Sequence, residues 1–356
     1  MKSTQILRPE LGRLRSYHVQ DAQGLIKLDA MENPYGWPPE LVDQWLQVLR
    51  SATPNRYPDP ACLPLKGLLR QFNEVPDSAE MLLGNGSDEV IQILLMALPP
   101  SATVMAPEPT FVMYRQIAES LGLHFVGVPL LEENFDIDLE RFKELIDLHD
   151  PSLIFLSYPN NPTGNLFERS KIESILASAS GFVVLDEAYT PFAGDSFMAE
   201  IPFHSNLLVM RTLSKLGLAG LRLGFLCGRP EWIHEFEKLR LPYNINCLTQ
   251  MTAEFALKHS EVLDDQVRQI LKDRQEMFET LRGFPGIRVF ESSTNFLLLK
   301  LDTDKVQGVF DGLRSQGILI KNLHPQGGLL AGCLRVTIGT PDENDQFIRA
   351  FRREMS

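Results

Sequence analysis

The 356-residue sequence predicts an α/β protein, with a large domain built on a mostly parallel sheet between helices and a smaller α+β domain. First, short apolar runs alternate with longer helical segments between residues 80 and 230. Second, these runs are apolar on both faces, which is typical of a parallel sheet covered by helices on both sides. Third, the C-terminal third combines a long charged helix with separate strands.

The large domain is expected to span residues 50–250, and 1–49 with 251–356 are expected to form an N-terminal segment and the small domain. Its strands are expected at 81–83, 102–107, 124–130, 152–158, 181–189, 207–212 and 223–228. A loop at 33–39 precedes an amphipathic helix expected at 40–50. The C-terminal helices are expected at about 250–282 and 303–315, and the strands at 287–292, 295–301, 318–323 and 333–339. Thr340, Pro341 and Glu343 carry the capping box of a last helix.

The composition excludes several classes of protein. The sequence has 34 Lys and Arg against 46 Asp and Glu, a formal net charge of −12, which argues against a general nucleic-acid or anionic-membrane surface. The four cysteines form no CxxC pair and the seven histidines show no metal spacing, so no metal site is expected. Residues 1–19 contain no apolar signal core, and we expect a cytoplasmic protein with reduced thiols.

Polar motifs follow four of the expected strands, at the end of the sheet where ligands bind in open α/β folds. The motif "GNGSDEV" at 84–90 opens a helix near Ser87, whose free amides suit a phosphate, although a plain helix cap explains the same residues. The motif "PNNPTG" at 159–164 is a rigid turn that offers the amides of Asn160 and Asn161, or a structural turn alone.

The other two motifs carry charges in apolar surroundings. In "DEAY", Asp186 follows four apolar residues, so its carboxylate favours a cationic partner; a helix N-cap is the alternative. In "RTLSKLGLAGLRLGF", Lys215 stands alone among apolar residues and glycines, with Arg222 seven residues later; a surface lysine is the alternative. Together the four motifs fit a ligand with a phosphate, a basic ring nitrogen, a phenolic oxygen and an aldehyde, which are the groups of pyridoxal phosphate.

The motifs "PNNPTG", "LDEAY" and "SKLGLAGLRLG" resemble those of the fold-type I pyridoxal-phosphate aminotransferases, and the resemblance covers nearly the whole chain. It narrows to the histidinol-phosphate group of that family through "AMENPYGWP", "RYPDP", "GNGSDEVI", "PEPTFVMY" and "CLRVTIGTPDEN". The resemblance implies transamination between L-histidinol phosphate and 2-oxoglutarate, giving imidazole acetol phosphate and glutamate, in histidine biosynthesis. It also implies a homodimer with shared active sites.

The resemblance further implies a role for each motif residue. Lys215 would hold the cofactor as a Schiff base and then move a proton between substrate and cofactor carbons, for which a lysine with a lowered pKa is suited. Asp186 would pair with the protonated ring nitrogen, and Tyr189 and Asn161 would hydrogen-bond the phenolic oxygen. Phe111 would stack on the ring. The phosphate would be held by Ser87, Asp88, Thr212, Ser214 and Arg222, and by Tyr57 from the neighbouring subunit.

For the substrate, the resemblance implies a carboxylate clamp at Arg335, which suits guanidinium geometry, and a contribution from Asn33. This chain departs from the pattern of its relatives at two places. Many relatives have one more residue between the lysine and the arginine, so the turn here must be tighter. Some relatives carry an arginine where this chain has Lys321, and His324 nearby is a further candidate for the substrate phosphate.

Other functions fit less well. Within the same fold, an aromatic-amino-acid aminotransferase or a threonine-phosphate decarboxylase is the alternative. A non-catalytic cofactor-binding regulator would need a fused DNA-binding segment, for which the chain has neither a spare domain nor a basic patch. A nicotinamide dehydrogenase is disfavoured because no GxGxxG follows an expected strand.

Overall fold

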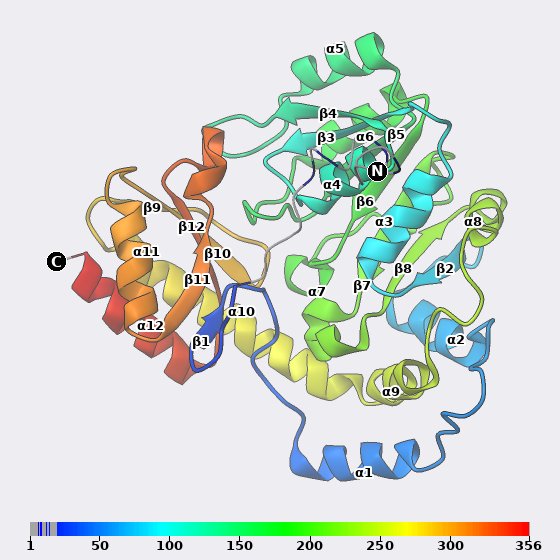
Figure 1. Cartoon of the computed structure of the whole chain (residues 1–356), viewed down its shortest axis with the longest axis horizontal. Helices are drawn as coiled ribbons and strands as arrows, with labels where there is room; N and C mark the ends of the chain where they lie inside the picture. Colours follow the sequence, from blue (N-terminus) through cyan, green and yellow to red (C-terminus); the bar gives the residue numbers. More distant parts are fainter. Residues whose placement is uncertain (1–5, 7, 9–11, 13, 15–19, 356) are drawn as a thin grey trace.

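The computed structural model, which describes residues 6, 8, 12, 14 and 20–355, contains two β-sheets with helices packed around them (Figure 1). Residues 1–19, where the sequence shows no apolar signal core, lie largely outside the described part of the chain. Among the described residues, no helix has the length and apolar character needed to cross a membrane. The architecture is mixed α/β, as the sequence predicts.

The larger sheet has seven strands in the order β2-β8-β7-β6-β5-β3-β4. Strands β4, β3, β5, β6 and β7 pair in parallel, and the exception is β8, which is antiparallel to both β7 and β2. The strand expected at 181–189 is shorter than predicted, because the chain leaves the sheet at Asp186. The strands are β2 Glu80–Gly84, β3 Thr103–Glu108, β4 His124–Pro129, β5 Leu153–Ser157, β6 Phe182–Asp186, β7 Leu207–Thr212 and β8 Gly224–Gly228.

Helices bury both faces of this sheet, as expected for mostly parallel strands. Val183 and Leu185 of β6 belong to one hydrophobic cluster, shared with α2, α5 and α6, and Val184 belongs to a second, shared with α3, α4 and α8. The helices up to residue 237 are α1 Pro39–Leu49, α2 Leu63–Phe72, α3 Ser87–Met96, α4 Met113–Ser120, α5 Leu139–His149, α6 Arg169–Ser178, α7 Thr190–Ala193 and α8 Pro230–Glu237.

The smaller sheet has five strands in the order β1-β11-β12-β10-β9. Strand β1 pairs in parallel with β11, and the other pairs are antiparallel, so segments from both ends of the chain build this sheet together (Figure 1). Helix α11 packs on β11 and against α12. The elements are β1 Ile26–Leu28, β9 Ile287–Val289, β10 Phe296–Leu301, α11 Val306–Ser315, β11 Ile318–Asn322, β12 Cys333–Thr337 and α12 Pro341–Glu354.

The prediction of a single helix at 250–282 is wrong, because the structure has two helices here, α9 Cys247–Lys258 and α10 Ser260–Arg282. The break falls at His259, whose φ of −123° and ψ of 37° are not helical. Its ring Nδ1 lies 2.9 Å from the carbonyl oxygen of Phe255, a contact that competes with the regular helical pattern. Helix α10 then runs from α9 to the smaller sheet (Figure 1).

Two local predictions are confirmed. Thr340 accepts a hydrogen bond from the backbone N–H of Glu343, and the Glu343 carboxylate accepts one from the backbone N–H of Thr340 at 2.8 Å, which completes the capping box of α12. The four cysteines are free thiols.

A buried ion pair joins the carboxyl ends of the two central strands. Glu187 follows β6 and is 1% exposed, and its Oε2 accepts hydrogen bonds from the guanidinium of Arg211 in β7 at 2.8 and 2.9 Å. Both groups have further partners, because Ser196 donates to Glu187 and Arg211 donates to the side chain of Asn73 at 3.0 Å. A buried ion pair is tolerated only when its remaining polar atoms are satisfied in this way.

Replacing Glu187 with Gln should lower the free energy of unfolding by about 3 kcal/mol, since the Arg211 charge would stay buried without a counter-charge. Urea denaturation measures this loss. The control is Glu144→Gln in the exposed pair with Arg141, where the expected change is below about 0.5 kcal/mol. Equal losses in the two variants would contradict a special role for the buried pair.

Candidate active site

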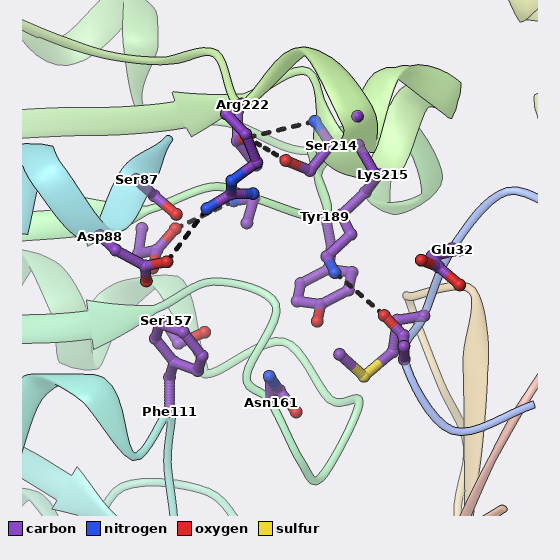
Figure 2. A pocket seen from close by; sticks show the side chains of 17 residues that line it. Glu32, Ser87, Asp88, Phe111, Ser157, Asn161, Tyr189, Ser214, Lys215 and Arg222 are labelled. Carbon is purple, nitrogen blue, oxygen red and sulfur yellow. Dashed lines mark hydrogen bonds and ion pairs between the residues drawn. The ribbon is translucent and has the colours of Figure 1, made fainter. Parts of the chain in front are cut away.

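A cavity of about 400 Å³ lies at the carboxyl ends of β5, β6 and β7 (Figure 2). The N-terminus of α3 lines one side of it, and the segment between β1 and α1 lines another. The structure brings ten of the sequence-predicted residues together around this cavity: Ser87, Asp88, Phe111, Asn161, Asp186, Tyr189, Thr212, Ser214, Lys215 and Arg222.

Asp186 ends β6 and is 3% exposed. One carboxylate oxygen accepts a hydrogen bond from the Tyr114 hydroxyl at 2.6 Å, and the other accepts one from the backbone N–H of Ala188 at 3.2 Å. Burial raises the pKa of Asp186 to about 6; the two hydrogen bonds act against this shift, and the nearby carboxylates of Asp88 and Glu187 add to it. The site thus holds an acid that favours a cationic partner.

Lys215 lines the same cavity as Asp186 and lies in the turn that follows β7. Its Nζ donates a hydrogen bond to the carbonyl oxygen of Ala30 at 3.3 Å and lies 5.7 Å from the centre of the Tyr189 ring (Figure 2). Burial lowers the pKa of Lys215 to about 8, and the charge of Arg335 acts in the same direction. A larger share of the amine is therefore neutral and nucleophilic near neutral pH than for an exposed lysine.

The N-terminus of α3 forms an anion cradle with the turn after β7. Gly86 precedes the helix with a φ of +89°, and no side chain caps the first amides there. A Cβ at Gly86 would lie 2.6 Å from Nη2 of Arg222, and one at Gly224 would lie 2.6 Å from the backbone N of Ser87. Gly86 is therefore required by its positive φ, and Gly224 by the close approach of the backbone of Ser87. Arg222 donates to Asp88 at 3.2 Å within the cradle.

The stretch from Lys215 to Arg222 is short, and the backbone accommodates this. It begins as the π-helical turn Ser214–Leu218, in which Gly217 has a φ of +119°, and Arg222 itself is left-handed with a φ of +50°. These two positions let both charged residues reach one cavity. The hydroxyls of Thr212 and Ser214 lie 2.9 Å apart on the same side, where they complete the polar lining.

Other expected site residues lie outside the cavity lining. Arg335 of β12 is buried and donates hydrogen bonds to Oδ1 of Asn161 and, at 2.9 Å, to the carbonyl oxygen of Asp29, so it borders the site. Asn33 instead supports the turn from behind, because its amide donates to the carbonyl oxygen of Leu216 at 3.3 Å and to Gln266 at 2.9 Å.

Tyr57, Lys321 and His324 were further candidates. Tyr57 is 81% exposed and stacks on Tyr243 with ring centres 4.4 Å apart. Lys321 pairs in register with Arg335, and burial, followed by the Arg335 charge, lowers its pKa. His324 lies in a short turn, where its Nδ1 accepts a hydrogen bond from the backbone N–H of Gly332 at 3.0 Å.

Sequence reasoning missed several residues of the site. The cavity is also lined by Met31, Glu32 and Ser157, and Tyr114 contacts Asp186 directly. For Tyr114 the sequence offered only its place three residues after Phe111, and it did not show where the hydroxyl would lie. Both belong to the quoted motif "PEPTFVMY", of which only Phe111 was assigned a role.

Comparison with known proteins identifies the class. Residues 23–351 match the family model described as aminotransferase class I and II. The chain belongs to this family, and it is an aminotransferase.

Its relatives narrow the assignment. The chain is 53% identical to histidinol-phosphate aminotransferase 2 of Nitrosococcus oceani over 98% of this chain and 97% of that protein, and 45% identical to the histidinol-phosphate aminotransferase of Chromobacterium violaceum over 98% of each. The crystal structure of the Clostridium acetobutylicum histidinol-phosphate aminotransferase matches 93% of this chain and 99% of that chain, with a TM-score of 0.85 and 27% identity. Within its family, the chain therefore belongs with the histidinol-phosphate aminotransferases.

A further solved structure has the same fold. Histidinol-phosphate aminotransferase from Sinorhizobium meliloti, in complex with pyridoxal-5'-phosphate, matches 99% of this chain and 98% of that chain. The TM-score is 0.86 at 21% identity, so the likeness is one of fold.

The lowered pKa of Lys215 predicts how its reactivity depends on pH. In protein freed of small ligands, acylation of Lys215 by an amine-selective reagent should rise to half of its maximum near pH 8, because only the neutral amine reacts. Peptide mass spectrometry across a pH series measures this rise. Labelling that rises only near the ordinary value of 10.5 would show that burial does not lower the pKa.

Proposed function

We propose that the protein transfers the amino group of L-histidinol phosphate to 2-oxoglutarate, giving imidazole acetol phosphate and glutamate, in histidine biosynthesis. The observation that carries this proposal is one cavity in which the amine of Lys215 and the buried carboxylate of Asp186 lie beside an anion cradle. The identity with histidinol-phosphate aminotransferases over nearly the full length supports this substrate.

The polar groups of the cavity fit pyridoxal phosphate as cofactor. The uncapped amides at Ser87 and Asp88 and the guanidinium of Arg222 suit its phosphate, and the glycines at 86 and 224 make room for the approach. The hydroxyls of Thr212 and Ser214 would add to the phosphate site. Asp186 suits the protonated ring nitrogen, and Phe111, Tyr189 and Asn161 line the space where the ring would lie.

When bound, pyridoxal phosphate supplies an aldehyde and a ring that takes up electrons from a bond broken at the substrate's amino carbon. Lys215 would bind the aldehyde carbon through Nζ. Once substrate has displaced it, its neutral amine would accept a proton from one carbon and deliver it to another. Asp186 would keep the ring nitrogen protonated, and the hydroxyl of Tyr189 and the amide of Asn161 would orient the phenolic oxygen.

Substrate recognition is assigned to the small-domain side of the cavity. Arg335 would clamp the glutamate carboxylate in one half-reaction and the phosphate of histidinol phosphate in the other, because the latter substrate has no carboxylate. Lys321 lies beside Arg335 and would add a second positive charge. Asn33 would act from the N-terminal segment by holding the turn that carries Lys215.

We further propose a cytoplasmic homodimer with shared active sites, in which Tyr57 reaches the cofactor phosphate of the neighbouring subunit. The dimer is supported by a set of exposed apolar side chains, which lie on segments that contact one another around Tyr57. These side chains are Tyr57, Leu63, Leu241, Tyr243 and Leu248. The division into a large domain at 50–250 and a small domain with the N-terminal segment also stays a proposal.

A different substrate within the same fold is the alternative: an aromatic amino acid, or threonine phosphate in a decarboxylation. Screening amino donors against the purified, cofactor-loaded protein separates these reactions. Histidinol phosphate should convert the cofactor absorbance to that of the aminated form in a single half-reaction, whereas Phe, Tyr and His should react slowly. Faster conversion by Phe or Tyr would favour the aromatic specificity, and release of carbon dioxide from threonine phosphate would favour the decarboxylase.

Replacing Lys215 with Ala should remove the covalent link to the cofactor. The turnover rate should fall by a factor of about 10⁴ or more, because both the nucleophile and the proton carrier are lost. Steady-state assays and the visible absorbance spectrum measure this. Lys143→Ala is the control, since Lys143 lies on α5 and does not line the cavity. Undiminished turnover in Lys215→Ala would refute the assignment.

Mixing two inactive variants tests the shared site. Tyr57→Ala and Lys215→Ala dimers, unfolded and refolded together, should regain up to about a quarter of wild-type activity, because half of the subunits form mixed dimers with one intact site each. The control refolds each variant alone. Mixed dimers, shown by differently tagged chains, that stay inactive would contradict the sharing of Tyr57.

A further inference from the structure

Tyr114 connects helix α4 to the end of β6 through its hydroxyl. The side chain is fully buried, and the hydroxyl donates a hydrogen bond to Oδ2 of Asp186 at 2.6 Å. Its ring stacks on Phe155 of β5, with ring centres 4.4 Å apart and planes 2° from parallel. Phe111, which lines the cavity, meets the same ring edge-on at 5.5 Å. The tyrosine is therefore held on two sides and has little freedom to turn away from Asp186.

The hydrogen bond has one chemically consistent direction. Burial and the neighbouring Asp186 carboxylate raise the pKa of Tyr114 well above its ordinary value, so the phenol keeps its proton and donates it. The backbone N–H of Ala188 binds the other oxygen of Asp186. With one donor on each oxygen, the carboxylate plane is fixed while lone pairs remain for a cationic partner in the cavity.

We propose that Tyr114 is a positioning residue of the cofactor site, which acts through Asp186 by fixing the orientation of its carboxylate and keeping it ionised toward the ring nitrogen. This inference rests on the proposed function, because it assigns the cationic partner of Asp186 to the ring of pyridoxal phosphate. Tyr114 itself does not line the cavity and touches no reacting atom. Phe111, which would stack on the cofactor ring, and Tyr114, which would orient the partner of the ring nitrogen, lie only three residues apart in the chain.

Tyr114→Phe keeps the stacked ring and removes only the hydroxyl. Apoprotein of this variant should bind pyridoxal phosphate about tenfold more weakly than wild-type apoprotein, because a hydrogen bond to a charged carboxylate is lost. Equilibrium titration by fluorescence or visible absorbance measures the dissociation constant without any turnover.

Tyr158→Phe is the matched control. The Tyr158 hydroxyl also donates to a carboxylate at 2.6 Å and its ring is also buried, but its partner is Asp195, which does not line the cavity. This variant should bind pyridoxal phosphate within about twofold of wild type, whatever it loses in thermal stability. Equal weakening in the two variants would mean a general packing effect and would overturn the role assigned to Tyr114.

The pH dependence separates positioning from packing. Loss of the hydroxyl should raise the pKa of Asp186 further, so the acid side of the affinity profile should move to higher pH in Tyr114→Phe. The charged and titratable groups around Asp186 are unchanged by the variant: Asp88 from α3, Glu187, which follows β6, Tyr189, and Lys215 and Arg222 from the turn after β7. An unshifted profile with unchanged affinity would overturn the proposal.

A double-mutant cycle with Asp186→Asn shows whether the effect passes through Asp186. If it does, Tyr114→Phe should change cofactor affinity by less than about twofold in the Asp186→Asn background. A full tenfold loss in that background would place the effect of Tyr114 elsewhere. Wild-type apoprotein that takes up no pyridoxal phosphate would refute the proposed function itself. Equal binding by wild type and Tyr114→Phe would refute only the role assigned to Tyr114.

Discussion

The buried ion pair between Glu187 and Arg211 is the constraint on which the geometry of the site depends. Glu187 directly follows the cavity residue Asp186 at the end of β6, and Arg211 directly precedes the cavity residue Thr212 at the end of β7. The pair therefore fixes β6 and β7 relative to each other at that point. Glu187 directly follows Asp186, so the contact with Arg211 also holds the end of β6 at which Asp186 lines the cavity. The buried charges of Glu187 and Arg211 are costly to bury singly, but as a pair they hold the strand ends that carry the site.

The fold was largely predictable because apolar patterning reports burial. Val183, Val184 and Leu185 are apolar in succession, and the structure divides them between the cores on the two faces of the sheet. The same pattern carries no information on strand direction, so the reversal of β8 could not be predicted from it. The break at His259 was missed for a related reason: the apolar spacing continues across it, while the conformation of one residue ends α9.

The site was predictable where a polar residue interrupts an apolar run at a strand end, as Asp186 and Lys215 do. Tyr114 does not interrupt anything; a tyrosine on the apolar face of a helix has the sequence pattern of a core residue, and only the fold shows that its hydroxyl reaches β6. The glycines at 86 and 224 are similar cases. Gly86 is required by its positive φ, and Gly224 by the close approach of the backbone of Ser87, which is far from Gly224 in the sequence.

The two central charges of the site oppose folding at neutral pH. The pKa of Asp186 rises from 3.8 to about 6, so the penalty for its buried charge is absent below pH 4 and grows as the pH rises to 6. The pKa of Lys215 falls from 10.5 to about 8, so the penalty for its buried charge is full below pH 8 and disappears above pH 10.5. Near pH 7 both residues are charged and both penalties apply. A ligand that places a cation beside Asp186 and a carbonyl group beside Lys215 relieves both at once, so binding and folding stabilise each other at this cavity.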